Sequence, residues 1–123
     1  MKVAIPRMGE RVAPCFEYCA TMAIFNVADS GEVEQVDFPL KSREPFDRVR
    51  LLRDQKVEAL ICGGMQSFYE DLLKANGFEV ISWVEGNVED LLALYLRGEL
   101  VSGTELPLEP GPDFLAMDRM TEH

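Results

Sequence analysis

The second half of the sequence alternates between stretches of helical spacing and short apolar runs. Phe46, Val49 and Leu52 recur at helical spacing. Pro45, just before them, suits a helix start because its missing N–H needs no partner there. Residues 59–62 are continuously apolar, which is typical of a strand covered on both faces. Strands that alternate with helices pair in parallel through right-handed crossovers, so this alternation restricts the chain to an α/β fold.

The first half of the sequence is predicted to form strands, and further strands and helices follow in the second half. The other expected elements are a strand over residues 3–5 closed by Pro6, a loop over 7–19, strands over 21–27 and 33–39, a helix over 67–77, a strand over 80–83 and a helix over 87–98. The turn residues at 29–31 join two of these strands in a hairpin. Ser67 followed by Glu70 predicts a capping box for the second helix. Together these elements predict a single-domain α/β fold, a mixed five-stranded sheet with helices on both faces.

The chain is predicted to divide into one domain and a tail. A length of 123 residues is ordinary for a single domain. Residues 1–104 hold the strands and helices of the expected domain, whereas residues 105–123 form an acidic tail that contains proline. In the last twenty residues Arg119 is the single base against five acids. One short helix is expected near residues 114–120.

The charge of the chain restricts its partners. Twelve basic against twenty-two acidic residues give a net charge of −10, which argues against binding to nucleic acids or anionic membranes. No apolar run approaches the roughly 18 residues of a membrane span, and no signal peptide is visible. Three cysteines without a secretion signal fit a reducing compartment. We therefore expect a cytoplasmic protein.

The three thiols are the first candidates for chemistry. Cys15 and Cys19 lie four residues apart, and Cys62 ends the strand before Gly63 and Gly64. If strands 3–5 and 59–62 pair in parallel, the 7–19 loop and the glycine pair meet at the carboxyl edge of the sheet, where open α/β sheets bind ligands. Thiolates suit copper(I), zinc and iron–sulfur species. Free cysteines are also among the most buried residues, so a structural role stays open for each thiol.

The glycine pair is a second candidate. Free N–H groups and the following helix favour an anion near Gly63 and Gly64. A glycine pair after a strand is also often only a tight turn.

Common catalytic arrangements cannot be assembled. The sole histidine is His123, so Ser–His and Cys–His nucleophile pairs are excluded. Glu10, Glu17, Asp29 and Asp37 show no paired spacing, and a solvated surface is expected for all four. We therefore predict that the protein is not an enzyme.

Basic residues concentrate between positions 41 and 56. This window carries a net charge of +3 and contains Lys41, Arg43, Arg48, Arg50, Arg53 and Lys56. It fits either a docking face for an acidic protein or a solvated helix face.

Several segments, in order, resemble a known family. They are MKVAIP (residues 1–6), VAPCF (12–16), LICGGM (60–65) and VEDLL (88–92), the last followed by GEL (98–100). Together they look like the dinitrogenase iron–molybdenum cofactor biosynthesis family of small, NifX-like cofactor carriers. The resemblance covers residues 1 to about 104. It implies a ribonuclease H-like fold, which agrees with the strand order, and binding or delivery of metal clusters without catalysis.

The resemblance also points to particular residues. It places the cofactor-binding positions at Cys15 and at Cys62, Gly63 and Gly64. Family members often carry a histidine or another residue where this chain has Cys15, and a glycine where it has Glu17. A sulfur ligand could thus replace a nitrogen ligand. The first strand lacks the acids of ribonuclease H-like nucleases, so nuclease activity is not expected.

The cysteines, the glycine pair and the family resemblance together predict a function. We expect non-catalytic binding, storage or delivery of an iron–sulfur or molybdenum-containing cluster during metallocofactor assembly, with protein donors or acceptors as partners. Cys15 and Cys19 are the predicted metal ligands, and Cys62, Gly63 and Gly64 complete the predicted cofactor-binding set. The alternative is a metal-free protein-interaction or regulatory module of the same fold. A third option is a small-anion binder at the glycine pair.

Overall fold

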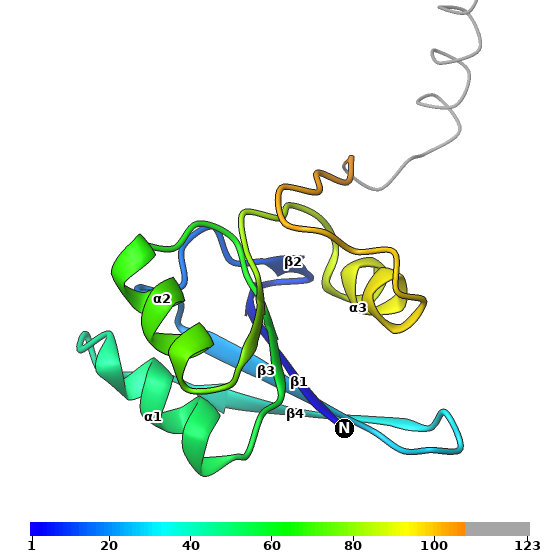
Figure 1. Ribbon diagram of the computed structural model, residues 1–123, viewed down its shortest axis with the longest axis horizontal. Helices are drawn as coiled ribbons and strands as arrows, with labels where there is room; N and C mark the ends of the chain where they lie inside the picture. The colour runs from blue at the N-terminus through cyan, green and yellow to red at the C-terminus, as the bar shows by residue number, and fades with distance from the viewer. Residues whose placement is uncertain (108–123) are drawn as a thin grey trace, which may run out of the picture.

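A six-stranded mixed sheet forms the centre of the protein (Figure 1). The computed structural model describes residues 1–107. Its strands are β1 (Lys2–Met8), β2 (Arg11–Val12), β3 (Thr21–Val27), β4 (Val33–Pro39), β5 (Ala59–Ile61) and β6 (Glu79–Ile81). The spatial order is β4-β3-β1-β5-β6, and β2 pairs with β1. The α/β class and the mixed sheet are confirmed, whereas the ribonuclease H-like assignment stays a prediction.

The strands of the first half of the chain pair antiparallel, and those of the second half pair in parallel. β1, β3 and β4 pair antiparallel, and β3 and β4 form the expected hairpin. β1 pairs in parallel with β5, and β5 with β6. β2 was not predicted; it is a strand of two residues joined to β1 by a turn in which Gly9 takes a φ of +63°. So short a strand has no periodicity to detect.

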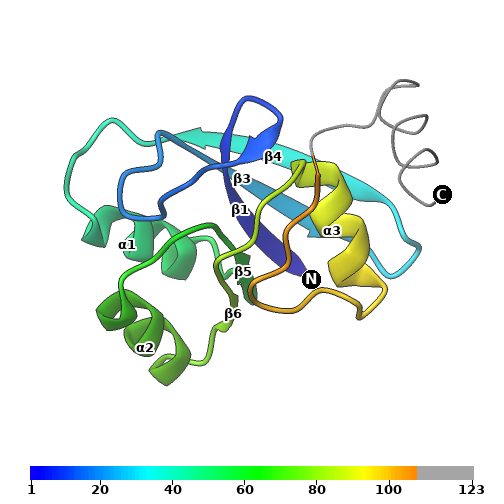
Figure 2. The same cartoon turned by 90° about the horizontal axis from the view of Figure 1, so that it is seen from above.

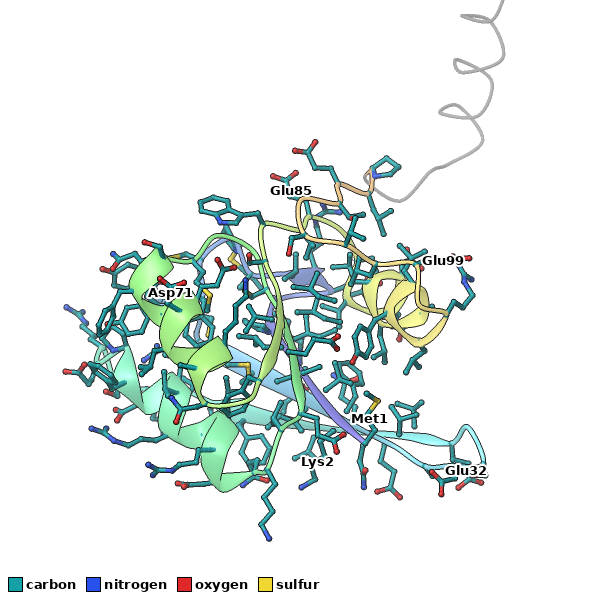
Figure 3. The ribbon with its side chains drawn as sticks, in the orientation of Figure 1. Met1, Lys2, Glu32, Asp71, Glu85 and Glu99 are labelled. Atoms are coloured by element: carbon teal, nitrogen blue, oxygen red, sulfur yellow. The ribbon has the colours of Figure 1, made fainter. Side chains whose placement is uncertain are left out.

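The helices cover both faces of the sheet, as predicted. They are α1 (Phe46–Asp54), α2 (Ser67–Ala75) and α3 (Val88–Leu96). α1 and α2 lie on one side of the sheet and α3 on the other (Figure 2). Because side chains alternate along a strand, Val3 and Ile5 of β1 pack in the core beside α3 while Ala4 packs in the opposite core. Figure 3 shows the side chains that fill these two layers.

Pro6 does not close the first strand, contrary to the sequence-based expectation. β1 continues through it to Met8, and Pro6 is paired with Met22 of β3. The parallel pairing with β5 ends earlier, at Ala4 and Leu60. The missing N–H of Pro6 therefore costs no bond to β5, and its carbonyl accepts a hydrogen bond from Ala13 N–H at 2.8 Å.

The start of the predicted tail lies against the domain. Glu85 N–H donates to Thr104 C=O at 2.9 Å, and Leu106 N–H donates to Glu85 C=O at 2.8 Å. The rest of the tail, with the short helix expected near 114–120, lies outside the described residues. Within residues 1–107, no helix combines the length and the apolar character needed to cross a membrane.

Candidate functional site

The loop after β1 packs against the glycine pair after β5. Phe16 N–H donates to Gly64 C=O at 2.9 Å, and Gly64 N–H donates to Pro14 C=O at 2.8 Å. These bonds form an isolated parallel bridge between Cys15 and Gly64. The bridge follows the carboxyl ends of β1 and β5, which pair in parallel. The expected meeting of loop and turn at this edge is confirmed.

Both glycines are needed because the backbone of the loop comes so close. A Cβ on Gly63 would lie 2.5 Å from the carbonyl oxygen of Ala13. A Cβ on Gly64 would lie 3.0 Å from the carbonyl oxygen of Pro14 and 3.2 Å from the ring of Trp83. The pair is therefore a point of close backbone approach, and neither glycine adopts a positive φ.

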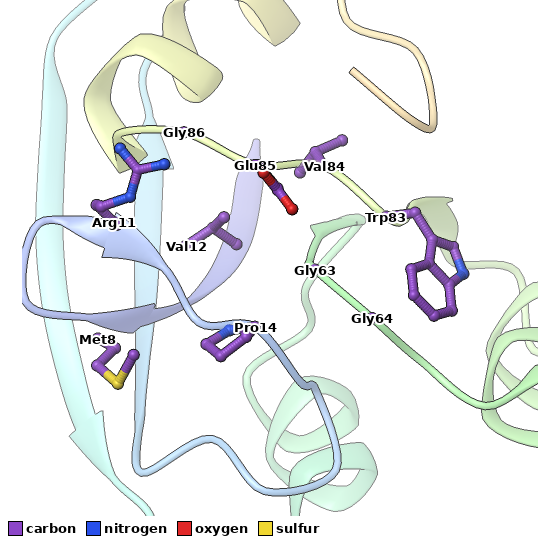
Figure 4. Close-up of a pocket in the computed structure, with 10 residues that line it drawn as sticks. All are labelled: Met8, Arg11, Val12, Pro14, Gly63, Gly64, Trp83, Val84, Glu85 and Gly86. Carbon is purple, nitrogen blue, oxygen red and sulfur yellow. The ribbon is translucent and has the colours of Figure 1, made fainter. Parts of the chain in front are cut away.

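A cavity of about 310 Å³ opens beside this contact. Its lining includes Arg11, Pro14, Gly63, Gly64, Trp83 and Glu85. Figure 4 shows Pro14 on one side of the glycine pair and Trp83 on the other. Trp83 is 62% exposed and has a φ of +60°, a strained value for a residue with a side chain. An exposed aromatic ring thus borders the cavity.

A second cavity, of about 340 Å³, is lined by the two cysteines that were predicted to be metal ligands. It is lined by Met8, Pro14, Cys15, Tyr18 and Cys19, among others. Pro14 lines both cavities and therefore lies between them. The structure brings Cys15 and Cys19 to one cavity, together with the thioether of Met8.

Cys15 is the most accessible of the three thiols. It is half-buried, and its Sγ–H donates to Oε2 of Glu17 at 2.9 Å. Burial and this hydrogen bond raise the pKa of Cys15, whereas the backbone N–H groups of Glu17 and Tyr18 lower it. The group is a protonated thiol at neutral pH, with a carboxylate positioned to take its proton.

Cys19 and Cys62 lie in the hydrophobic core beside α1 and α2. Cys19 is 3% exposed, and burial raises its pKa to about 11 against the opposing effect of the Arg48 charge. Burial likewise raises the pKa of Cys62, and the negative charges of Glu70 and Glu17 raise it further. The three sulfur atoms share one region, but two of them are covered by apolar side chains.

Ready-made metal coordination is absent from the part of the chain that the structure describes. Across residues 1–107, no three side chains of the His, Cys, Asp and Glu types are grouped so that they could hold a metal ion.

Glu17 belongs to the site, and the prediction that it lies on the solvated surface is wrong. Its side chain is buried, and its second carboxylate oxygen, Oε1, accepts a hydrogen bond from the backbone N–H of Gln66 at 2.7 Å. Gln66 is the N-cap residue of α2 and makes no cap with its own side chain. Only a contact between distant segments explains this burial, and no local pattern signals it.

The expected capping box is also wrong. Glu70 accepts a hydrogen bond from the hydroxyl of Ser82, after β6, instead of returning to Ser67. The start of α2 is capped instead by the carboxylate of Glu17, which also accepts a hydrogen bond from the Cys15 thiol.

Arg48 holds the far end of the loop. The prediction placed it on an exposed basic face, but it points into the core and is buried. Its guanidinium donates to the carbonyl oxygens of Cys19 at 2.8 Å and Ser42 at 2.7 Å. Its Nε has no hydrogen-bond partner among residues 1–107. Glu17 and Arg48 thus fix the same C-terminal part of the loop, at Glu17 itself and at Cys19.

Comparison with known proteins gives one family match. The sequence model of the family described as dinitrogenase iron-molybdenum cofactor matches residues 1–98, which is most of the chain. A search of curated proteins found no match.

Solved structures share the fold. A candidate NifB protein from Thermotoga is 27% identical, with a TM-score of 0.62, covering 89% of this chain and 98% of that one. A candidate dinitrogenase from Methanocaldococcus jannaschii is 25% identical, with a TM-score of 0.64, covering 81% and 91%. The orange protein of Desulfovibrio gigas, in its apo form, is 22% identical, with a TM-score of 0.62, covering 90% and 94%. This last similarity concerns the fold alone.

Proposed function

This chain belongs to the dinitrogenase iron–molybdenum cofactor family, and from that premise we propose that it is a non-catalytic carrier of a metal–sulfur cluster. Its cargo is an iron–sulfur or molybdenum-containing cluster, which it binds, stores or delivers during metallocofactor assembly. It works in the cytoplasm and exchanges the cluster with protein donors and acceptors. The observation that carries the proposal is the bridge between Cys15 and Gly64, which sets an accessible thiol against the glycine pair between two cavities.

Cys15 and Cys19 are the proposed metal ligands. Both line the cavity of about 340 Å³, and thiolate sulfur is a preferred ligand of iron–sulfur species. Cys15 binds first because it is the more accessible. Cys19 joins after the loop shifts, since its sulfur is covered in the structure. Cys62 lies behind them in the core and assists from there.

Glu17 supports this role by its position. When a metal–sulfur bond forms at Cys15, the S–H bond breaks, and Oε2 of Glu17 at 2.9 Å accepts the proton. The backbone of Gly63 and Gly64 leads into the N-terminus of α2, and such termini favour negative charge. This N-terminus already holds the carboxylate of Glu17, and Gly64 N–H already donates to Pro14, so an anionic cluster would gain from this field only after the loop had moved.

Anaerobic reconstitution with iron and sulfide tests the proposal. Bound metal and sulfide are measured for the wild type, for Cys15→Ala combined with Cys19→Ala, and for Cys62→Ala, which removes only the assisting thiol. We expect the double variant to lose the cluster and Cys62→Ala to lose a smaller part of it. Circular dichroism checks that each variant is folded. A folded double variant that binds as much cluster as the wild type would show that the ligand assignment is wrong.

The alternative is a metal-free interaction module. It is favoured by the exposed arginines of α1, Arg50 and Arg53, in a chain of strongly negative charge. A host protein that binds the metal-free chain, and is lost when both arginines are reversed to glutamate, would support it. Loss of binding on removal of Cys15 would instead favour the carrier.

A further inference from the structure

The 123 residues of the chain hold fewer thiols than an iron–sulfur cluster takes. Iron–sulfur clusters are commonly bound by four cysteine thiolates. The sequence contains three cysteines, and its sole histidine is His123. Two of the thiols, Cys15 and Cys19, line one cavity, while Cys62 lies fully buried in the core. One chain therefore supplies two of the four thiolates at this cavity, and the other two come from elsewhere.

Large apolar side chains surround the accessible thiol at the surface. Met8 is 65% exposed and Tyr18 is 71% exposed, and both line the cavity of Cys15. Met8 also lines the neighbouring cavity, which the exposed ring of Trp83 borders. In the view of Figure 4, Met8 and Trp83 lie on opposite sides of Pro14. Exposed apolar side chains grouped in this way mark a surface that another molecule covers. We call Met8, Tyr18 and Trp83 the apolar rim.

The surface around the two cavities lacks the negative charge of the rest of the chain. The net charge of the whole sequence is −10. The charged residues that line the two cavities are Arg7, Arg11 and Glu85, which together carry a net charge of +1. Two copies that meet through this surface therefore add little repulsion at the contact, although each chain is acidic as a whole.

A second copy of the chain completes the set of thiolates. In a twofold dimer the same surface meets itself, so a residue near the axis faces its own counterpart. Cys15 is the accessible thiol on this surface, and near the axis it faces the Cys15 of the second copy. With Cys19 from each chain the two copies supply four thiolates, the number that a [2Fe–2S] cluster takes. A small thiol from solution would supply the missing sulfur as well, but it would leave the apolar rim uncovered.

We propose that two copies of the chain share one [2Fe–2S] cluster between them, an inference that rests on the proposed carrier function. Cys15 and Cys19 of each copy bind the iron, and the apolar rims of the two copies pack against each other around it. Two iron(III) ions, two sulfide ions and four thiols combine with no change of oxidation state. Four S–H bonds break, four Fe–S bonds to cysteine form, and four protons leave. In each copy Oε2 of Glu17 accepts the proton of Cys15, and Cys19 releases its proton after the loop has shifted.

Native mass spectrometry after anaerobic reconstitution tests the sharing. The full chain is incubated with iron(III) and sulfide, with no small-molecule thiol added, and the chains, iron and sulfide in each complex are counted. We expect the wild type to form a complex of two chains with one cluster, which is about one iron per chain. The metal-free chain should be mostly monomeric at the same concentration. Cys15→Ala combined with Cys19→Ala should form neither the cluster nor the dimer.

A charge placed on the apolar rim provides a matched comparison. Tyr18→Glu sets two like charges against each other where the copies meet. Val101→Glu adds the same charge at a residue that is 66% exposed and lines neither cavity. We expect Tyr18→Glu to reduce the amount of cluster-bearing dimer at least about tenfold and Val101→Glu to leave it unchanged. Circular dichroism checks that both variants are folded.

The possible results separate this inference from the carrier function. One cluster on a single wild-type chain, or two clusters on a dimer, would overturn the sharing and leave the carrier function standing. A cluster-bearing dimer that Tyr18→Glu leaves intact would also overturn it, because the copies would then meet through another surface. A wild type that binds no cluster at all would contradict the carrier function itself, and the inference with it.

Discussion

The carboxylate of Glu17 accepts a hydrogen bond from the backbone N–H of Gln66 at 2.7 Å, across 49 residues of sequence. The other oxygen of the same carboxylate accepts a hydrogen bond from the Cys15 thiol. One buried side chain therefore fixes the start of α2 and orients the most accessible thiol. The stability of the helix start and the state of the thiol are linked through this group.

Replacing Glu17 should weaken the fold. Glu17→Ala leaves the N–H of Gln66 without its partner, and we expect a loss of about 2 kcal/mol in the free energy of unfolding, measured with urea. Glu17→Gln keeps one acceptor oxygen and should lose less. Glu10→Ala, in the exposed turn after β1, is the control and should change stability by under about 0.5 kcal/mol. Equal losses for Glu17→Ala and Glu10→Ala would contradict the capping role.

Gly63 should tolerate no side chain. The Cβ of Gly63→Ala would meet the carbonyl oxygen of Ala13 at 2.5 Å, so loop and turn must separate. We expect this variant to lose about 3 kcal/mol in urea unfolding. Gly9→Ala is the comparison, because Gly9 has a φ of +63° but open space around it. It should lose only about 1 kcal/mol, the usual strain of a left-handed residue.

Stability should fall at high pH because of Cys19. Burial raises its pKa to about 11, so the folded state holds this proton more tightly than the unfolded chain does. The contribution is complete below about pH 9, the ordinary value, and is lost as the pH rises towards 11. Between pH 8 and 11 the wild type should lose about 2 kcal/mol more than Cys19→Ala does. Parallel stability curves for the two proteins would rule out a buried thiol at this position.

Arg48 should stabilise the fold through the hydrogen bonds of its guanidinium and not through its charge alone. Arg48→Met leaves the carbonyl oxygens of Cys19 and Ser42 without a donor, and we expect a loss of about 2 kcal/mol. Arg48→Lys should not restore stability, because one ammonium cannot reproduce the geometry of the guanidinium. Arg50→Met, on the exposed side of α1, serves as the control. Full recovery with lysine would mean that charge alone matters.

At most positions a protein with alanine is more stable than one with glycine, but at Trp83 the strained backbone should reverse this order. Glycine adopts a φ of +60° without strain, whereas alanine does not. Trp83→Gly should therefore be more stable than Trp83→Ala by about 1 kcal/mol. Because Trp83 is the sole tryptophan, unfolding is followed by circular dichroism. A more stable alanine variant would show that the loop relaxes when the ring is removed.

Local sequence patterns determined the elements of this fold. The spacing of Phe46, Val49 and Leu52 and the apolar run at 59–62 predict α1 and β5, because side-chain periodicity is a property of neighbouring residues. Asn87, a residue type favoured at helix N-caps, caps α3 by accepting a hydrogen bond from Glu89 N–H. The meeting of the loop and the glycine pair was predicted on the condition that the first strand pairs in parallel with the 59–62 strand, and β1 does pair in parallel with β5.

Tertiary structure alone decided which side chains are buried at the site. Glu17 looks like a surface acid and Arg48 like a surface base, yet both are buried because segments far apart in the sequence supply their hydrogen-bond partners. The same packing covers Cys19 and leaves Cys15 accessible, although both lie in the same loop. Burial of a polar group depends on partners brought by other elements, and a pattern of neighbouring residues contains no information about them.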